Sequence, residues 1–167
     1  LVSCSSFRVS IVESIPLGMS LAHNTSIADA LLEMIHDARY DVSVAAFYMD
    51  LTSGNKSEGG QPGQDVFDGL VAAVQRNVSV KLVINGATDL FPNTDAFELA
   101  RQGVQVRFLN FSQIFAPKPG GVLHTKLYTK DVSVEALNDE STTPAFLIAS
   151  ANCDWKSFTQ VKEIGAY

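Results

Sequence analysis

Residues 121–131 read GVLHTKLYTKD, and this stretch indicates how the chain folds. Its apolar and β-branched residues are typical of a strand. A histidine and a lysine, His124 and Lys126, interrupt the apolar run at positions i and i+2. In an extended strand such side chains project from the same face, so the sequence predicts an imidazole and an ammonium group side by side.

The histidine and lysine pair is suited to phosphate chemistry. A neutral histidine is a nucleophile or proton carrier near neutral pH, and a lysine ammonium is a compact charge that can hold a phosphate oxygen. Asp131 follows Lys126 by five positions and completes the spacing H-x-K-x4-D. The alternative reading of these residues alone is a strand with two exposed polar side chains and an aspartate in the next turn.

Composition bounds the class of protein. The chain has 167 residues, of which 46% are hydrophobic, so it can bury the core of one domain. No apolar run is long enough to cross a bilayer, which predicts a soluble globular chain. The net charge of −6 means that a polyanion must bind at a local focus of positive charge. Because the first residue is not methionine and no signal segment is visible, we expect a fragment or a mature form.

Cysteines and glycosylation sequons indicate the compartment. Two cysteines are too few for a disulfide scaffold. We expect Cys153 to be a buried thiol and Cys4 to seek a partner beyond residue 167. Chance would produce about one sequon in such a chain, but four Asn-x-Ser sequons are present, at Asn24, Asn55, Asn77 and Asn110. The excess favours the lumen of the secretory pathway, either endoplasmic reticulum or lysosome, or secretion, with any membrane anchor upstream of residue 1. Compositional bias is the alternative.

Hydrophobic periodicity predicts alternating strands and helices. Strands are expected at residues 7–13, 40–49, 78–84, 104–109 and 145–149, with a further strand beginning at 161–167. Three- and four-residue apolar spacings predict helices at residues 26–38, 64–76 and 93–102. Residues 52–64 predict a mobile surface loop, and residues 133–143 form a polar insertion. The order predicts one α/β domain with a largely parallel sheet.

Two segments resemble the phospholipase D superfamily. HTKLYTKD at residues 124–131 is similar to its HKD motif, and SANCDWKSFTQVKEIG at residues 150–165 is similar to the Ser-x-Asn turn and the segment that follow that motif. The combination is most similar to the animal branch that includes phospholipase D three and four, whose luminal domain begins with a segment like IVESIP at residues 11–16. The resemblance implies an α/β/α sandwich with a mixed, largely parallel central sheet.

The resemblance also implies a role for each site residue. His124 would be either the nucleophile that forms a phosphohistidine or the acid that protonates the leaving oxygen, and the sequence leaves both open. Lys126 and Asn152 would bind phosphate oxygens, with Ser150 as a weaker contributor. Glu163 would hydrogen-bond the other ring nitrogen of His124 and so fix its tautomer.

Some features depart from the family pattern or fall outside it. Asp131 would be structural in the family, and we expect its carboxylate to cap a turn. Ala149 replaces the glycine that usually precedes the serine, and the insertion at 133–143 lengthens the gap after Asp131. Phe47 and Tyr48 are expected to pack in the core, with a position in a substrate groove as the alternative.

No cofactor and no metal are expected. The sequence contains no H-E-x-x-H motif, no cysteine cluster and no dense set of carboxylates. Two further histidines, His23 and His36, are predicted to be solvent-exposed or at the core edge and not catalytic.

Three hypotheses follow from the presence of one HKD motif where the family uses two. The first is the N-terminal half of a two-motif phosphodiesterase, cut within a strand. Its favoured activity is 5'-exonuclease cleavage of single-stranded DNA or RNA, and a phospholipase D or transphosphatidylase acting on phospholipids is the alternative. The second is a homodimer that supplies the other motif in trans. The third is a non-catalytic binding or scaffold protein, which the intact set of site residues disfavours.

Overall fold

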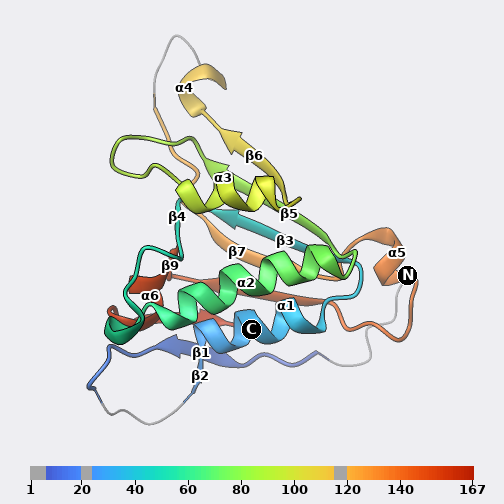
Figure 1. Cartoon of the computed structure of the whole chain (residues 1–167). Coiled ribbons are helices and arrows are strands. Elements are labelled where there is room, and N and C mark those ends of the chain that lie inside the picture. The colour runs from blue at the N-terminus through green and yellow to red at the C-terminus, as the bar shows by residue number, and fades with distance from the viewer. Residues whose placement is uncertain (1–6, 20–23, 115–119) are drawn as a thin grey trace.

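An eight-stranded mixed sheet with the order β2-β1-β10-β8-β7-β3-β5-β6 organises the chain (Figure 1). The computed structural model describes residues 7–19, 24–114 and 120–167. Its strands are β1 (Ile11–Ser14), β2 (Thr25–Ser26), β3 (Asp41–Ala46), β5 (Ser79–Asn85), β6 (Gln105–Leu109), β7 (Lys126–Lys130), β8 (Ala145–Ala149) and β10 (Glu163–Ala166). β3, β5 and β6 are parallel neighbours, as are β1 and β2, whereas the pairings from β3 through β7, β8 and β10 to β1 are antiparallel. The predicted mixed sheet is confirmed.

Three main helices lie on one face of this sheet (Figure 1). They are α1 (Ile27–Asp37), α2 (Gln61–Gln75) and α3 (Thr94–Arg101). Short helices α4 (Phe111–Ile114), α5 (Val134–Leu137) and α6 (Trp155–Thr159) and the 3-10 turn η1 (Lys56–Glu58) lie in the connections. A separate two-stranded parallel sheet joins β4 (Met49–Asp50) to β9 (Cys153–Asp154).

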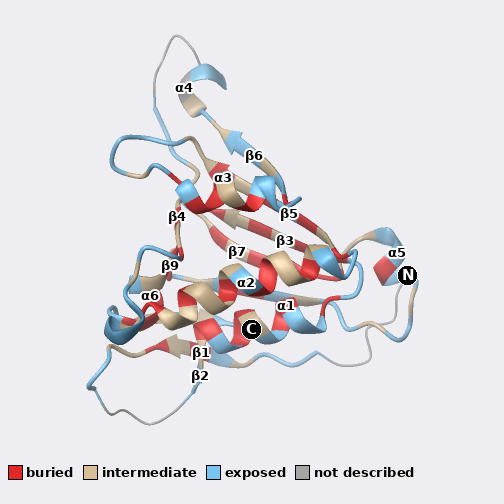
Figure 2. Ribbon diagram, viewed as in Figure 1, coloured by how far each residue is buried: buried red, intermediate tan, exposed pale blue. Residues whose placement is uncertain are grey.

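The core lies between the helices and the sheet, where Figure 2 shows the inner faces of α1 and α2 as buried. The inner side of α1 supplies Leu31 and Met34, both at most 1% exposed, and β3 and β5 supply Val42 and Ile84, both fully buried. Burying such apolar area is the main favourable term in folding. On the opposite face of β8, Phe146 and Ile148 remain exposed.

Local sequence signals explain most element boundaries. The Ser26 side chain accepts a hydrogen bond from the Asp29 amide at 2.9 Å and caps α1. Gly103 follows α3 with φ +100°, a conformation that favours glycine. α2 begins at Gln61, three residues before the predicted start, because Pro62 occupies its first turn.

Two predicted strands are shorter than expected. The predicted strand at 40–49 is divided into β3 and β4, because the chain bends at Phe47 and Tyr48. The predicted strand at 7–13 is reduced to β1. The predicted surface loop at 52–64 is held by α6 and its flanks: the Trp155 indole donates to the Ser53 hydroxyl at 3.1 Å, and the Gln160 amide donates to the Glu58 carbonyl at 2.7 Å.

The polar insertion at 133–143 lengthens the β7–β8 connection at one end of the sheet. Ser133 caps α5 by accepting a hydrogen bond from the Ala136 amide. Tyr40 donates to the Asp139 carboxylate at 3.0 Å, which fastens the insertion to the start of β3. The insertion therefore lies beside Asp131 and away from His124, which is at the other end of β7.

Candidate active site

His124 lies in the segment just before β7. His124 is therefore not part of the strand on which it was expected, although it stands beside Lys126 as predicted. Residues 120–125 leave the sheet, and the Leu123 amide donates to the Asn85 side chain at 3.0 Å instead of to a neighbouring strand. The two side chains still meet, with Lys126 Nζ 3.2 Å from Nε2 and 3.4 Å from Nδ1 of His124.

Lys126 is held at the first position of β7, opposite Ala46 of β3. It is 8% exposed, whereas His124 is exposed. Burial lowers the pKa of the Lys126 ammonium, and the charge of Glu163 opposes that shift. A partly desolvated ammonium attracts an anion more strongly than one in bulk water, so this end of β7 can hold an anion.

Glu163 and Ser150 come from neighbouring strand ends and bind each other. Ser150 directly follows β8 and Glu163 begins β10. The Ser150 hydroxyl donates to the Glu163 carboxylate and also accepts from the Ile164 amide at 3.1 Å. The predicted hydrogen bond between Glu163 and His124 is not formed among the described residues, because the carboxylate is turned toward Ser150.

Asn152 faces the aromatic residue Tyr48. Its side-chain oxygen is buried without a hydrogen-bond partner among the described residues, and its side chain lowers the pKa of the Tyr48 hydroxyl. The Tyr48 hydroxyl donates to Asp154 at 2.6 Å, and burial, the larger effect, raises its pKa overall. Asp154 in turn accepts from the Lys156 and Ser157 amides and caps α6. The Ser-x-Asn turn is thus joined to the β3–β4 connection.

Phe47 links this connection to the histidine. Its ring centroid lies 4.8 Å from that of His124 in an edge-to-face arrangement, and Lys126 Nζ lies 5.9 Å from the Phe47 ring centre. Phe47 also contacts Phe91 and Tyr48, with centroids 5.1 and 5.5 Å away. Phe47 and Tyr48, which were expected to pack in the core, are therefore half-buried beside His124.

Asp131 lies at the opposite end of β7 and is 1% exposed. Its carboxylate accepts hydrogen bonds from the amides of Arg39, Tyr40 and Asp41, the shortest at 2.8 Å. The Asp131 amide donates to the Asp41 carbonyl at 2.9 Å. Asp131 therefore caps the turn between α1 and β3, as expected.

The remaining predicted residues lie away from this cluster or outside the described residues. His36 is exposed near the end of α1. Cys153 is a buried free thiol, as predicted, and burial raises its pKa to about 12. His23 and Cys4 lie outside the described residues. In the described ranges, no group of three or more His, Cys, Asp or Glu side chains is placed to hold a metal ion.

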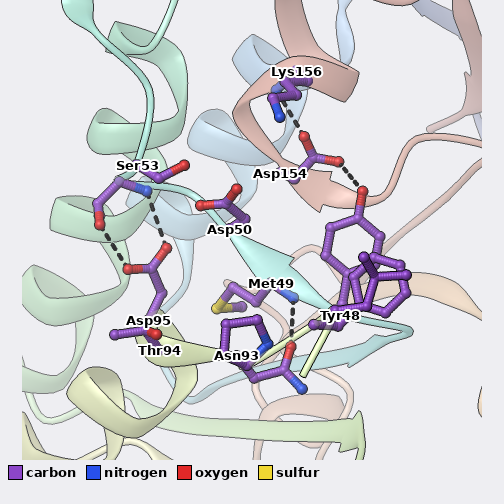
Figure 3. A pocket seen from close by; sticks show the side chains of 13 residues that line it. Tyr48, Met49, Asp50, Ser53, Asn93, Thr94, Asp95, Asp154 and Lys156 are labelled. Carbon is purple, nitrogen blue, oxygen red and sulfur yellow. Dashed lines mark hydrogen bonds between the residues drawn. The ribbon is translucent and has the colours of Figure 1, made fainter. Parts of the chain in front are cut away.

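Next to the cluster is a pocket of about 530 Å³ (Figure 3). Tyr48, Asp50, Phe91 and Lys156 are among its lining residues, together with the buried side chains of Asp95, in the first turn of α3, and Asn93, in the loop that precedes α3. Sequence reasoning assigned no site role to that loop. The signal for it was positional, because the pocket lies where the parallel strands β3 and β5 end, the edge at which α/β proteins form binding sites.

A family profile described as the PLD-like domain of cardiolipin synthase matches residues 31–167, which include the HKD motif and the Ser-x-Asn turn. The chain belongs to the phospholipase D family. The predicted family is confirmed, and the motif residues lie together at one edge of the sheet with the exception of Asp131.

Two named relatives illustrate the similarity of this phospholipase D family member. It is 39% identical to phospholipase D Z of Dictyostelium discoideum over 98% of this chain and 36% of that protein. It is 31% identical to the 5'-3' exonuclease PLD3 of Macaca fascicularis over 93% of this chain and 30% of that protein. The chain thus spans about a third of the length of each relative.

A solved structure has the same fold. The phospholipase D family member Nuc from Salmonella typhimurium superposes with a TM-score of 0.63 at 20% identity, covering 95% of this chain and 80% of that chain. At this identity the likeness concerns the fold. It confirms the α/β fold with a mixed sheet that was expected from the sequence.

Proposed function

We propose that this chain supplies one half of the active site of a phosphodiesterase that works through a phosphohistidine. The observation that carries the proposal is the partly buried Lys126 ammonium in contact with His124 at an open sheet edge. One histidine would attack phosphorus with a neutral ring nitrogen, forming an N–P bond while the P–O bond to the leaving alcohol breaks. A second histidine would protonate the leaving oxygen and later take a proton from the water that hydrolyses the N–P bond.

Residues around His124 fit the charge that develops in such a reaction. Lys126 would neutralise a non-bridging oxygen, and Asn152 would donate to another. Glu163 would turn from Ser150 toward the histidine ring when substrate binds and fix its tautomer. Whether His124 is the nucleophile or the acid depends on which side of the phosphate it faces.

The second histidine must come from a second HKD motif. The relatives are about three times as long as this chain, which supports a second motif in cis. A second copy of this chain in trans is the alternative, because a symmetric dimer would bring two identical motifs together. The molecular mass of the active species separates the two arrangements.

Single-stranded DNA or RNA cleaved from the 5' end is the substrate we favour. The similarity to the 5'-3' exonuclease PLD3 supports it. The higher identity to phospholipase D Z favours a phospholipid as the second candidate. The net charge of −6 is compatible with an exonuclease that contacts only a few nucleotides.

We place the protein in the lumen of the secretory pathway or outside the cell. The asparagines of all four sequons have exposed side chains: Asn24, Asn55, Asn77 and Asn110. Attached glycans need such positions. Across the part of the chain that the structure describes, no helix has both the length and the apolar character to span a membrane.

The test compares two substrates in the longest natural form of the protein. A 5'-hydroxyl single-stranded oligonucleotide and phosphatidylcholine vesicles are assayed at acidic and neutral pH, with His124→Ala as the inactive variant and His36→Ala as the matched histidine control. We expect oligonucleotide cleavage that His124→Ala abolishes and His36→Ala retains. Unchanged cleavage in His124→Ala contradicts the catalytic assignment, and hydrolysis of vesicles alone contradicts the favoured substrate.

A further inference from the structure

The pocket beside the site has an aromatic wall. Tyr48 and Phe91 stack with ring centroids 4.5 Å apart and an interplanar angle of 22°. Both rings line the pocket, and the ring of Phe47 contacts both Phe91 and His124. The wall is therefore connected to His124 through the Phe47 ring.

Most polar side chains of the pocket are already used by the fold (Figure 3). Asn93, 2% exposed, accepts from the Met49 amide and donates to the Asn85 carbonyl. Asp95 accepts from the backbone amides of Leu51 and Thr52. Asp154 is bonded to Tyr48 and to the start of α6. These groups shape the pocket but have little capacity left for a ligand.

Asp50 is different. It lines the pocket and is half-buried, and its carboxylate has no hydrogen bond or ion pair among the described residues. In Figure 3 no dashed line reaches it. A free carboxylate can accept hydrogen bonds from N–H or O–H groups of a ligand, and it repels a second phosphate.

These features distinguish between classes of ligand. Tyr48 and Phe91 cover each other's inner faces, so the pair offers an outer ring face, which fits one planar base, whereas a quaternary ammonium group needs several ring faces set around it. The lining carries the carboxylates of Asp50, Asp95 and Asp154 against the single ammonium of Lys156, so its net negative charge opposes a continuing phosphodiester chain. A volume of about 530 Å³ is within the range of small-molecule sites. The ligand that fits is a terminal nucleoside.

We propose that the pocket binds the terminal nucleoside of a nucleic-acid strand, with its base against the Tyr48–Phe91 wall and its polar groups toward Asp50. This inference rests on the proposed nuclease function and names the part of the substrate that the pocket binds. It also gives a reason for exonuclease action, because a pocket that rejects a further phosphate accepts only a strand end.

The test compares first-cleavage rates on two 5'-hydroxyl oligonucleotides that differ only in whether the 5'-terminal residue carries a base or is abasic. The longest natural form of the protein is used. We expect a preference of about tenfold or more in kcat/KM for the base-bearing end, because one stacked base contributes that much. Phe91→Ala should reduce this preference toward one, with a larger loss of kcat/KM on the base-bearing end than on the abasic end.

Phe97→Ala is the matched control, because Phe97 is a half-exposed phenylalanine stacked on Phe108 away from the pocket. It should keep the wild-type preference. The subsite is overturned if the wild-type enzyme cleaves both oligonucleotides equally well. It is also overturned if Phe91→Ala lowers kcat/KM equally on both ends, because Phe91 would then act through Phe47 and His124. Cleavage of phosphatidylcholine vesicles with no oligonucleotide cleavage overturns the subsite together with the proposed substrate.

Asp50→Asn tests the charge of the pocket separately. The wild type should cleave a 5'-phosphorylated strand more slowly than a 5'-hydroxyl strand. Removing the carboxylate charge should reduce that ratio severalfold while the preference for a terminal base persists. If the ratio of cleavage rates on the 5'-hydroxyl and 5'-phosphorylated strands is the same in Asp50→Asn as in the wild type, groups other than Asp50 exclude the phosphate. Asp50 is then removed from the proposal.

Discussion

The two ends of β7 hold two parts of one sequence motif in opposite chemical states. At one end, Asp131 is 1% exposed and accepts hydrogen bonds from three backbone amides. At the other end, the only hydrogen-bonding contact of the Lys126 side chain within the described residues is with His124. Only residues 127–130 of β7 lie between Asp131, whose hydrogen bonds are satisfied, and Lys126, whose ammonium can bind an anion.

This difference separates stability from function within the motif. A buried polar group that is fully hydrogen-bonded stabilises the fold, and removing it leaves its partners unsatisfied. A buried charge without an opposite partner costs free energy, which a bound anion can recover. We therefore expect mutations at the two ends of β7 to affect different measurements.

The largest effect is expected for His124→Ala. Loss of a covalent or acid catalyst should lower kcat/KM by about 10³-fold or more. Because His124 is exposed, its free energy of unfolding should change by no more than about 0.5 kcal/mol. Urea unfolding and oligonucleotide cleavage are measured on the same preparation. A large loss of stability in this variant would show that His124, like Asp131, stabilises the fold.

Lys126→Met should lower kcat/KM by about 10²-fold to 10³-fold, because positive charge at the phosphate is lost. Its stability should not fall, since burial of the ammonium is unfavourable. The lowered pKa of Lys126 also predicts a pH effect. The charge is present at low pH and is lost as the pH rises through a value below the ordinary 10.5, so activity declines on the alkaline side. Lys126→Arg keeps its charge and should move that decline to higher pH.

Asp131→Ala should reduce the free energy of unfolding by about 3 kcal/mol, because three backbone amides lose their acceptor. Its φ of +52° adds to the cost for alanine. Asp131→Asn keeps an acceptor oxygen and tolerates this φ, so it should lose only about 1 kcal/mol and retain kcat/KM when folded. A folded but inactive Asp131→Asn variant would contradict the view that Asp131 contributes to stability and not to catalysis.

Ser150→Ala should have the smallest effect. It removes the hydrogen bond that holds Glu163, and a bond to a charged group contributes about a tenfold change. We expect kcat/KM to fall by about tenfold with stability nearly unchanged, because Ser150 is exposed. The same variant at several pH values reports whether the freed Glu163 changes the ionisation of His124. Wild-type kcat/KM at every pH would show that the Ser150 contact does not position the carboxylate.

Periodicity and caps predicted most of the fold. The α1 boundary was within one residue of that expected, because Ser26 and the apolar spacing act locally. Strand β4 was not predicted as a separate element, because its pairing with β9 joins residues about a hundred positions apart. The early start of α2 was missed although Pro62 is a local signal for a helix start.

The HKD motif and the family resemblance predicted the residues of the candidate site and the separate capping role of Asp131, because residue type sets which groups can carry charge, donate or cap. Only the tertiary structure decided how they meet. It moved His124 off the strand, turned Glu163 toward Ser150, and brought Tyr48 and Phe91 together into a wall. Those contacts depend on where β3, β5 and β7 end in space, which is set by the packing of the whole sheet.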